Sequence, residues 1–409
     1  MCNIAVISVH TSPLAQPGTR DTGGMNVYIR ELSRQLSRRA HTLDIFTRRS
    51  DPGAPAVTAI DPRIRVIQVD AGAPETAKAD LRRYLGRFRD GVLRFQRQEG
   101  VEYDLVHSHY WLSGRVGQAL KEEWGVPHVV MFHTLAEAKN RHHPQEHEPR
   151  YRIEAERAVA QAADRVICAG RSESDTLVEL YGVSPRRIAV VPGGVDTERF
   201  RPMGRARARR RLGLDRCEPL VLFVGRIEPL KGIDVLLRAA ASLEGPLRLL
   251  IVGGDHKDRQ RKSALRSLAR ELGIPTRVTF RDAVPHEALH LYYNAADVCA
   301  VPSYYESFGL VAVEAMACGT PVVASRVGGL KETVQDGRTG YLAPWRCPEP
   351  FAERLDLLLR NEALRRSLGR GARAAAQRFH WPIVATRIEE VYHELVSQYR
   401  GVAVSAHVA

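Results

Sequence analysis

The sequence predicts an α/β protein with two domains, each built on a parallel β-sheet. Its 409 residues exceed what one ordinary hydrophobic core accommodates. Short apolar runs alternate with amphipathic helical patterns, as they do where parallel strands are joined by right-handed crossovers. The alternation stops at a Pro-Gly turn at residues 192–194 and then starts again, which indicates a domain boundary there.

The first half opens with an apolar run at residues 3–9, which we expect to form a buried strand. A loop rich in Pro and Gly leads from it into an amphipathic helix. At the start of this helix Gly24 can admit a phosphate or a sugar against the backbone, and Asn26 adds a polar group, although a flexible turn is the simpler alternative. Further strands are expected at residues 42–46, 64–69, 104–108, 128–132 and 166–168.

The second half repeats this organisation and ends in an amphipathic helix. Its strands are expected at residues 220–224, 247–252, 278–280, 298–301 and 321–324. We therefore predict an N-terminal domain over residues 1–194, a second domain over residues 195–379 and a terminal helix within residues 380–409.

The composition is that of an ordinary globular protein with an excess of positive charge. With 60 Lys and Arg against 47 Asp and Glu, the net charge of +13 favours anionic partners. The densest basic run, at residues 205–211, is interpreted as a solvated helix face. The six cysteines are far apart and several lie in apolar runs, which indicates buried thiols in a reducing compartment. Neither a signal peptide nor a membrane-spanning run is evident, so we expect a cytoplasmic protein.

The stretch at residues 298–325 combines a strand, a loop, a helix and a second strand. Ser307 is a plausible N-cap for the helix, whose first amides, those of Phe308, Gly309 and Leu310, would point toward an anion. Glu306 in the loop and Glu314 along the helix could accept hydrogen bonds from hydroxyl groups. Together these groups suit a nucleotide sugar. The alternative is a surface helix whose acids only complement the helix dipole.

Two cations follow the first strand of the second half. Arg226 and Lys231, in GRIEPLKG, are spaced to reach one diphosphate at the carboxyl end of the sheet. They could neutralise a leaving diphosphate without a metal ion. Solvated surface cations are the alternative.

The spacing Glu306-x7-Glu314 within ESFGLVAVEAMACGTPVVAS resembles the signature of retaining glycosyltransferases of family 4, which have the GT-B fold. The segments TGGMNVY and HTLAEAKN resemble the corresponding segments of the inositol-phosphate N-acetylglucosaminyltransferases of mycothiol synthesis. The segment RIEAE is instead similar to one in sucrose-phosphate synthases. The resemblance implies two facing Rossmann-like domains, with the terminal helix crossing back to the first.

The resemblance also assigns roles to residues. It implies that Arg226 and Lys231 bind the donor diphosphate, that Glu314 holds the ribose and that Glu306 contacts the sugar hydroxyls. His133 would lie beside the anomeric carbon, and the base would lie near the backbone of Arg281. Catalysis would involve His133, Arg226, Lys231 and Glu306; donor binding would add Gly24, Arg281, Phe308, Gly309, Leu310 and Glu314. The acceptor and its phosphate would be bound by Asn26, Lys78, Tyr110, Thr134, Lys139 and Arg152.

The function expected from this resemblance is transfer of a hexosyl or N-acetylhexosaminyl group from a nucleotide diphosphate sugar, such as a UDP-sugar, to a small phosphorylated polyol or sugar. The reaction would retain configuration by a same-face route, with no cofactor and no metal. The acceptor expected first is inositol phosphate, and fructose 6-phosphate is the alternative. A third expectation is a lipid acceptor at a membrane surface. A homodimer is compatible with the sequence.

Other functional classes lack their sequence features. A dinucleotide-dependent oxidoreductase needs G-x-G-x-x-G in the first strand-to-helix turn, and the nearest string, Gly369-Arg370-Gly371, lies in a helix-like run. No nucleic-acid-binding motif accompanies the positive charge, so no nucleic-acid partner is expected. The pair His143 and His147 could ligate a metal only on a helix, which Pro144 disfavours, and we expect a loop there.

Overall fold

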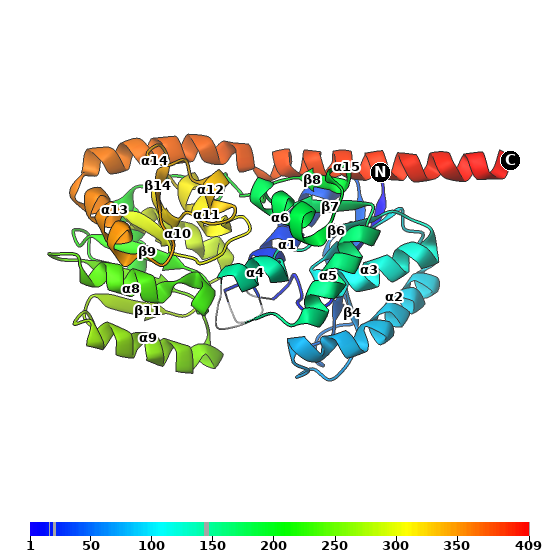
Figure 1. Cartoon of the computed structure of the whole chain (residues 1–409), viewed down its shortest axis with the longest axis horizontal. Helices are drawn as coiled ribbons and strands as arrows, with labels where there is room; N and C mark the ends of the chain where they lie inside the picture. Colours follow the sequence, from blue (N-terminus) through cyan, green and yellow to red (C-terminus); the bar gives the residue numbers. More distant parts are fainter. Residues whose placement is uncertain (16, 19–21, 143–146, 409) are drawn as a thin grey trace. The chain divides into compact units, whose positions relative to one another are not determined.

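The computed structural model describes residues 1–15, 17–18, 22–142 and 147–408, with side chains up to residue 401. The chain forms two compact units (Figure 1). The first unit consists of Met1–Ala15, Met25–Pro192 and Pro382–Ala409, and the second consists of Gln16–Gly24 and Gly193–Trp381. Of the pair His143 and His147, His143 lies outside the described residues, as does Pro144, whereas His147 is exposed and lies outside any helix.

The first unit contains an eight-stranded sheet in the order β3-β4-β2-β1-β5-β6-β7-β8. All neighbouring strands are parallel except β3 and β4, which form an antiparallel pair at the edge. The parallel sheet expected from the sequence is confirmed for the other strands, and β3 is an antiparallel edge strand that the sequence did not predict. The strands are β1 (Asn3–Ser8), β2 (Thr42–Arg48), β3 (Val57–Asp61), β4 (Ile64–Val69), β5 (Leu105–His109), β6 (His128–Met131), β7 (Arg165–Cys168) and β8 (Ile188–Val190).

The crossover helices of the first unit present apolar faces to this sheet. They are α1 (Gly24–Arg38), α2 (Leu85–Glu99), α3 (Trp111–Trp124), α4 (Ala136–His142), α5 (Arg150–Ala162) and α6 (Arg171–Tyr181). Gly117 of α3 lies against the buried ring of His128, where an added Cβ would stand 2.4 Å from Nε2. Close packing of helix on sheet at this point therefore depends on a glycine.

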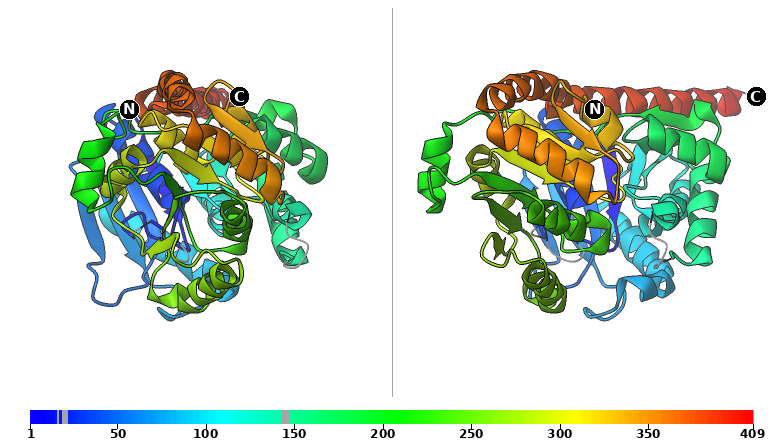
Figure 2. Two further views of the ribbon diagram at one scale, coloured as in Figure 1. Left: turned by 90° about the vertical axis from the view of Figure 1, so that its left-hand side faces the viewer. Right: turned by 60° about the vertical axis from the view of Figure 1, so that its left-hand side comes forward.

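The last helix, α15 (Trp381–Val408), is long and uninterrupted (Figure 2). From Pro382 onward it belongs to the first unit, where Val384, Ile388 and Leu395 are buried. Polar contacts reinforce this packing: Tyr399 donates to Asp164 at 2.8 Å, and Arg400 pairs with Asp104 at 2.6 Å. Although α15 has 28 residues, no helix in the described part of the chain is both long and apolar enough to cross a bilayer.

The second unit contains a six-stranded parallel sheet in the order β11-β10-β9-β12-β13-β14. Its strands are β9 (Leu220–Val224), β10 (Arg248–Val252), β11 (Val278–Arg281), β12 (Val298–Val301), β13 (Val322–Ser325) and β14 (Gly340–Ala343), the last of which the sequence did not predict. Its helices are α7 (Arg205–Leu212), α8 (Ile233–Ala241), α9 (Arg259–Glu271), α10 (Leu289–Ala295), α11 (Leu310–Ala317), α12 (Leu330–Thr333), α13 (Pro348–Arg360) and α14 (Glu362–Ala376). The string Gly369–Gly371 lies inside α14, not in a strand-to-helix turn.

Both sheets have a point where the strand order reverses. In the first unit the chain leaves β1 toward β2, and later returns to the other side of β1 as β5. In the second unit β9 is likewise flanked by β10 and β12. Loops diverge at the carboxyl ends of the strands at such a point, and they leave a crevice in which α/β proteins bind ligands.

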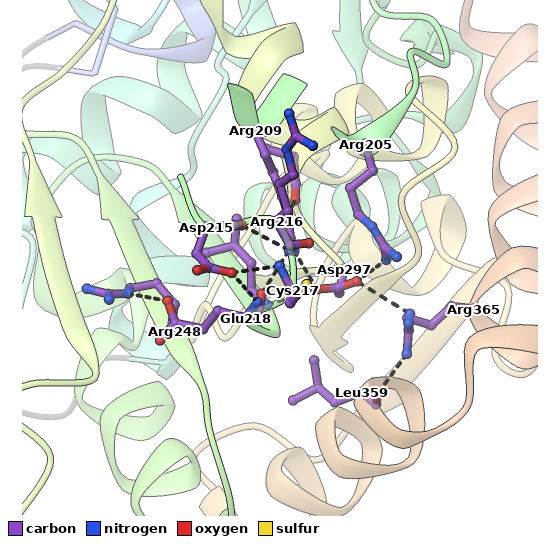
Figure 3. Close-up of polar contacts among 12 residues, drawn as sticks. Arg205, Arg209, Asp215, Arg216, Cys217, Glu218, Arg248, Asp297, Leu359 and Arg365 are labelled. Carbon is purple, nitrogen blue, oxygen red and sulfur yellow. Dashed lines mark hydrogen bonds and ion pairs between the residues drawn. The ribbon is translucent and has the colours of Figure 1, made fainter. Parts of the chain in front are cut away.

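The basic run at residues 205–211 does not form a wholly solvated face, which corrects the expectation from the sequence. Figure 3 shows Arg205, Arg209 and Arg365 around the carboxylate of Asp297. Arg209 is 2% exposed, binds Asp297 at 2.7 Å and donates to the carbonyl oxygens of Ala295 and nearby residues. The helix α7 is thus fastened to the sheet by a buried guanidinium, which alternating Arg and Ala in the sequence does not reveal.

The cysteines are free thiols. Four of them are buried, as expected: Cys2, Cys168, Cys299 and Cys318. Cys217 is exposed and Cys347 is half-buried, so the expectation of buried thiols is wrong for Cys217.

Candidate functional site

In the second unit, two predicted site residues meet where β9 and β12 end. Lys231 lies in the 3-10 turn Pro229–Lys231 that follows β9, and Glu306 lies in the loop after β12. Lys231 Nζ forms an ion pair with Glu306 Oε1, and the Ser303 hydroxyl donates to the same oxygen at 3.2 Å. Both charged side chains are about one-fifth exposed, so each remains reachable from solvent.

Arg226 also follows β9. Its Nη1 pairs with Glu228 Oε1 at 2.8 Å, and its side chain is 31% exposed. The loop residue Gly23 lies beside it, since a Cβ there would be 3.5 Å from Arg226 Nε. The neighbouring Gly24 lies against Leu310, with 3.9 Å between an added Cβ and Leu310 Cδ2. The glycine pair therefore bridges Arg226 and the start of α11.

The helix α11 begins at Leu310, and its N-cap is Gly309 with φ +87°. The expectation that Ser307 is the N-cap is therefore wrong. A Cβ at Gly309 would meet Leu330 Cδ2 at 2.5 Å, so both the backbone conformation and the packing require glycine. Among the described residues, the amides of Phe308, Gly309 and Leu310 have no hydrogen-bond acceptor. These amides can bind an anion.

Glu314 lies one turn further along α11 and is 2% exposed. His286 Nε2 lies 2.6 Å from its Oε1, and the Tyr293 hydroxyl donates to its Oε2 at 2.7 Å. Burial and the Glu314 charge raise the pKa of Tyr293, so its phenol remains a donor. Each carboxylate oxygen has a second lone pair and can accept a further hydrogen bond. Neither His286, in the 3-10 turn just before α10, nor Tyr293, in α10, was predicted from the sequence.

Arg281 ends β11, where its backbone carbonyl accepts the amide of Gly253 at 2.9 Å. Its side chain donates to the Tyr292 hydroxyl at 3.1 Å and to the carbonyl of Leu212 at 3.3 Å. Arg281 therefore lies at the carboxyl edge of the sheet, two strands from β9.

In the first unit, three of the predicted acceptor residues meet at one aromatic ring. The Tyr110 ring has Lys78 Nζ 4.4 Å from its centroid and Arg152 Cζ at 4.9 Å. Arg152 also donates to Thr134, at 3.2 Å to the carbonyl and 3.3 Å to the hydroxyl. Residues from the 3-10 helix η1 (Lys78–Tyr84), the N-cap of α3, the loop after β6 and α5 thus gather at one place.

Lys139 joins this group through Glu148, which pairs with both Lys139 and Arg152. Burial raises the pKa of Glu148, but attraction by Arg152 and Lys139 outweighs it and lowers the pKa overall. Arg152 has a second partner, the fully buried Glu156, at 2.8 Å. The group thus holds three cations, Lys78, Lys139 and Arg152, against the two carboxylates of Glu148 and Glu156. The remaining positive charge favours an anionic ligand.

Asn26 is placed differently from the other predicted acceptor residues. It is 1% exposed, and its Nδ2 donates to Thr11 Oγ1 at 2.7 Å and to the carbonyl of Ser12 at 2.6 Å. Asn26 therefore supports the loop after β1.

His133 follows β6 in the left-handed conformation, with φ 60°, and Tyr110 follows β5 with φ 76°. A non-glycine residue in such a backbone conformation costs about 1–3 kcal/mol of folding free energy. Residues of this kind cluster at functional sites. His133 Nε2 lies 2.9 Å from His109 Nδ1, and the Tyr28 ring packs edge-on against His133 at 5.3 Å. Burial lowers the pKa of His133 to about 3, so the ring is neutral at physiological pH. No role was predicted for His109 from the sequence, although it lies among the polar residues at the end of a predicted strand.

One group of described residues, His41, Glu389 and His393, lies close enough to share a metal ion. The amide of Cys2 donates to His41 Nδ1 at 3.2 Å, which places the ring proton on Nε2. Nε2 then donates to Glu389 at 2.9 Å and offers no lone pair to a metal. The hydrogen bond between His41 and Glu389 joins α15 to the segment that precedes β2.

Residues 204–375 match the family model described as "Glycosyl transferases group 1", and residues 22–199 match "Glycosyltransferase Family 4". The chain is 44% identical over 412 residues to the D-inositol 3-phosphate glycosyltransferase of Acidothermus cellulolyticus, covering 98% of this chain and 92% of that protein. It is 48% identical to the protein of the same name from Nocardia farcinica, covering 97% and 90%.

Among solved structures, the chain resembles the sucrose-phosphate synthase of Thermosynechococcus elongatus. The TM-score is 0.92 at 36% identity, and the match covers 97% of this chain and 100% of the other.

Proposed function

Because this chain belongs to the group 1, family 4 glycosyltransferases, we propose that it transfers a hexosyl or N-acetylhexosaminyl group from a UDP-sugar to an inositol phosphate. The relatives named D-inositol 3-phosphate glycosyltransferase support this acceptor. The observation that carries the proposal is the group of Lys78, Tyr110, Thr134, Lys139 and Arg152, which offers cations and hydroxyls to one phosphate.

The second unit supplies the donor side of the proposal. Lys231, Arg226 and the amides that begin α11 bind the diphosphate, and Glu314 accepts from the ribose. Glu306, held by Lys231 and Ser303, binds hydroxyls of the sugar. Because Lys231 and Arg226 already have acidic neighbours, their ammonium and guanidinium groups are oriented before a donor arrives.

The reaction breaks the bond between the anomeric carbon and the diphosphate oxygen, which leaves negative charge on the diphosphate. Lys231, Arg226 and the helix amides stabilise that charge, and they need not rearrange to do so. The acceptor hydroxyl attacks from the same face, and its proton passes to the departing diphosphate oxygen. Configuration is thereby retained. No metal enters these steps.

Transfer to fructose 6-phosphate is the second candidate, which the similarity to the sucrose-phosphate synthase favours. Both acceptors carry a phosphate, so the group around Tyr110 does not discriminate between them.

A product assay tests these proposals. UDP-, ADP- and GDP-sugars are each combined with inositol phosphate, fructose 6-phosphate and phosphatidylinositol vesicles, and products are identified by mass spectrometry. A glycosylated inositol phosphate is the expected product. Sucrose phosphate or a glycolipid as the sole product would overturn the acceptor assignment.

A further inference from the structure

A row of polar aromatic side chains runs through the first unit from the terminal helix to His133. It begins at the Tyr392 hydroxyl on α15, which lies 2.5 Å from His107 Nδ1. The rings of His107 and His109 pack with centroids 4.2 Å apart, and His109 Nδ1 meets His133 Nε2 at 2.9 Å.

We infer that His109 is a positioning residue that fixes the ring of His133 in one tautomer, and that Tyr392 anchors the row from α15. This inference rests on the proposed function, together with the catalytic role that the family resemblance implies for His133. The His133 ring must then present a defined donor or acceptor, because a hydroxyl of the sugar distinguishes an N–H from a lone pair.

The hydrogen bond between the two rings couples their tautomers. Burial lowers the pKa values of both His109 and His133, so both rings are neutral. A single proton can lie between His109 Nδ1 and His133 Nε2. If His109 donates it, the proton of His133 is on Nδ1; if His133 donates it, the proton of His109 is on Nε2. Fixing one ring therefore fixes the other.

Packing holds His109 in place. His107 and His109 lie two residues apart on β5, so their side chains share one face of the strand. Each is 1% exposed, and the Tyr28 ring packs edge-on against His109 at 5.8 Å. The surrounding core therefore limits rotation of both rings.

Tyr392 is the polar anchor of His107. His107 Nε2 is buried and has no hydrogen-bond partner among the described residues, so the Tyr392 hydroxyl makes the polar contact of this ring. Removing that hydroxyl would leave His107 free to change its contact with His109. In this way α15 contributes to the site although it lies at the end of the chain.

Three variants test the inference. His109→Ala removes the hydrogen bond to His133. His109→Asn keeps it, because an amide atom of Asn occupies the place of Nδ1 and can donate or accept. Tyr392→Phe removes the anchor and keeps the ring. His393→Ala is the matched control, because His393 is the next residue of α15 and is exposed.

The first measurement is the tautomer of His133 in the full-length protein, read from long-range ¹H–¹⁵N correlations with ¹⁵N-labelled histidine. We expect one tautomer in the wild type, the His109→Asn variant and the control, and a mixture in the His109→Ala variant. In the transfer assay, His109→Ala should lower kcat about 10- to 100-fold with little change in either KM. His109→Asn should restore kcat to within about threefold, and Tyr392→Phe should lower it about fivefold.

The inference is overturned if His109→Ala leaves the His133 tautomer unchanged, or if a folded His109→Asn variant is as impaired as His109→Ala. Because the tautomer is measured without substrate, it tests the row even if the wild type transfers no sugar. Absence of transfer with a single His133 tautomer would count against the proposed function alone.

Discussion

Acid should destabilise the first unit strongly, because its core contains histidines that fold in the neutral form. His107 and His128 are 1% and 0% exposed, and burial lowers the pKa of each from 6.5 to about 3. Between pH 6.5 and pH 3 the unfolded chain binds a proton at each ring that the folded protein does not bind. The free energy of unfolding therefore falls as the pH falls through this range.

The expected size follows from the same values. Lowering the pH from 7 to 5 costs about 2 kcal/mol for each ring, or about 4 kcal/mol for His107 and His128 together. His109, whose pKa burial also lowers, acts in the same direction. Since a domain is typically stable by about 5–15 kcal/mol, this loss is a large fraction of the total.

Urea denaturation at pH 7 and pH 5 tests this prediction, with hydrogen exchange in peptides from β1 and β5 as the probe of the first unit. His128→Gln removes one titrating ring and should reduce the pH-dependent loss by about 2 kcal/mol. Equal free energies of unfolding at the two pH values, or an unchanged pH dependence in His128→Gln, would refute the reasoning.

Four further outcomes are expected. Lys231→Gln should lower kcat/KM for the donor by about 100-fold or more, measured by initial rates, because a donor to the diphosphate is lost. Lys78→Gln should raise the acceptor KM about tenfold and leave donor hydrolysis unchanged; equal damage to both would contradict the acceptor assignment. Arg209→Met should destabilise the second unit by about 3 kcal/mol in thermal denaturation, whereas the exposed Arg210→Ala should not. Gly309→Ala should lower the free energy of unfolding by at least about 1 kcal/mol. It should also weaken nucleotide binding, which calorimetry would measure.

The buried strands and the residues at their carboxyl ends could be predicted from the sequence. Continuous apolar runs identify strands that are covered on both faces. Arg226, Lys231 and Glu306 follow such runs directly, and the strand order then brings them to one edge. Predicting this part of the site requires only the local sequence and the geometry of parallel sheets.

Other features depend on contacts between distant segments. β3 is an exposed edge strand, so its hydrogen bonding to β4 leaves no apolar pattern. Arg209 is buried only because carbonyl groups and Asp297 surround it in the folded unit. His286 lies 28 residues before Glu314, and no spacing rule links the two. Lys78, Tyr110 and Arg152 were all predicted by resemblance, but the packing of both cations against the Tyr110 ring depends on the fold.

The stretch Gln16–Gly24 lies between β1 and α1 in the chain but belongs to the second unit, while Pro382–Ala409 returns to the first. The polypeptide consequently passes between the units four times, at residues 15–16, 24–25, 192–193 and 381–382. A recombinant fragment of residues 193–381 would lack the backbone that hydrogen-bonds Gly254 and lies beside Arg226. Cleavage at Pro192 would not release two self-sufficient halves, and a nascent chain cannot complete the first unit until residues 382–409 have been synthesised.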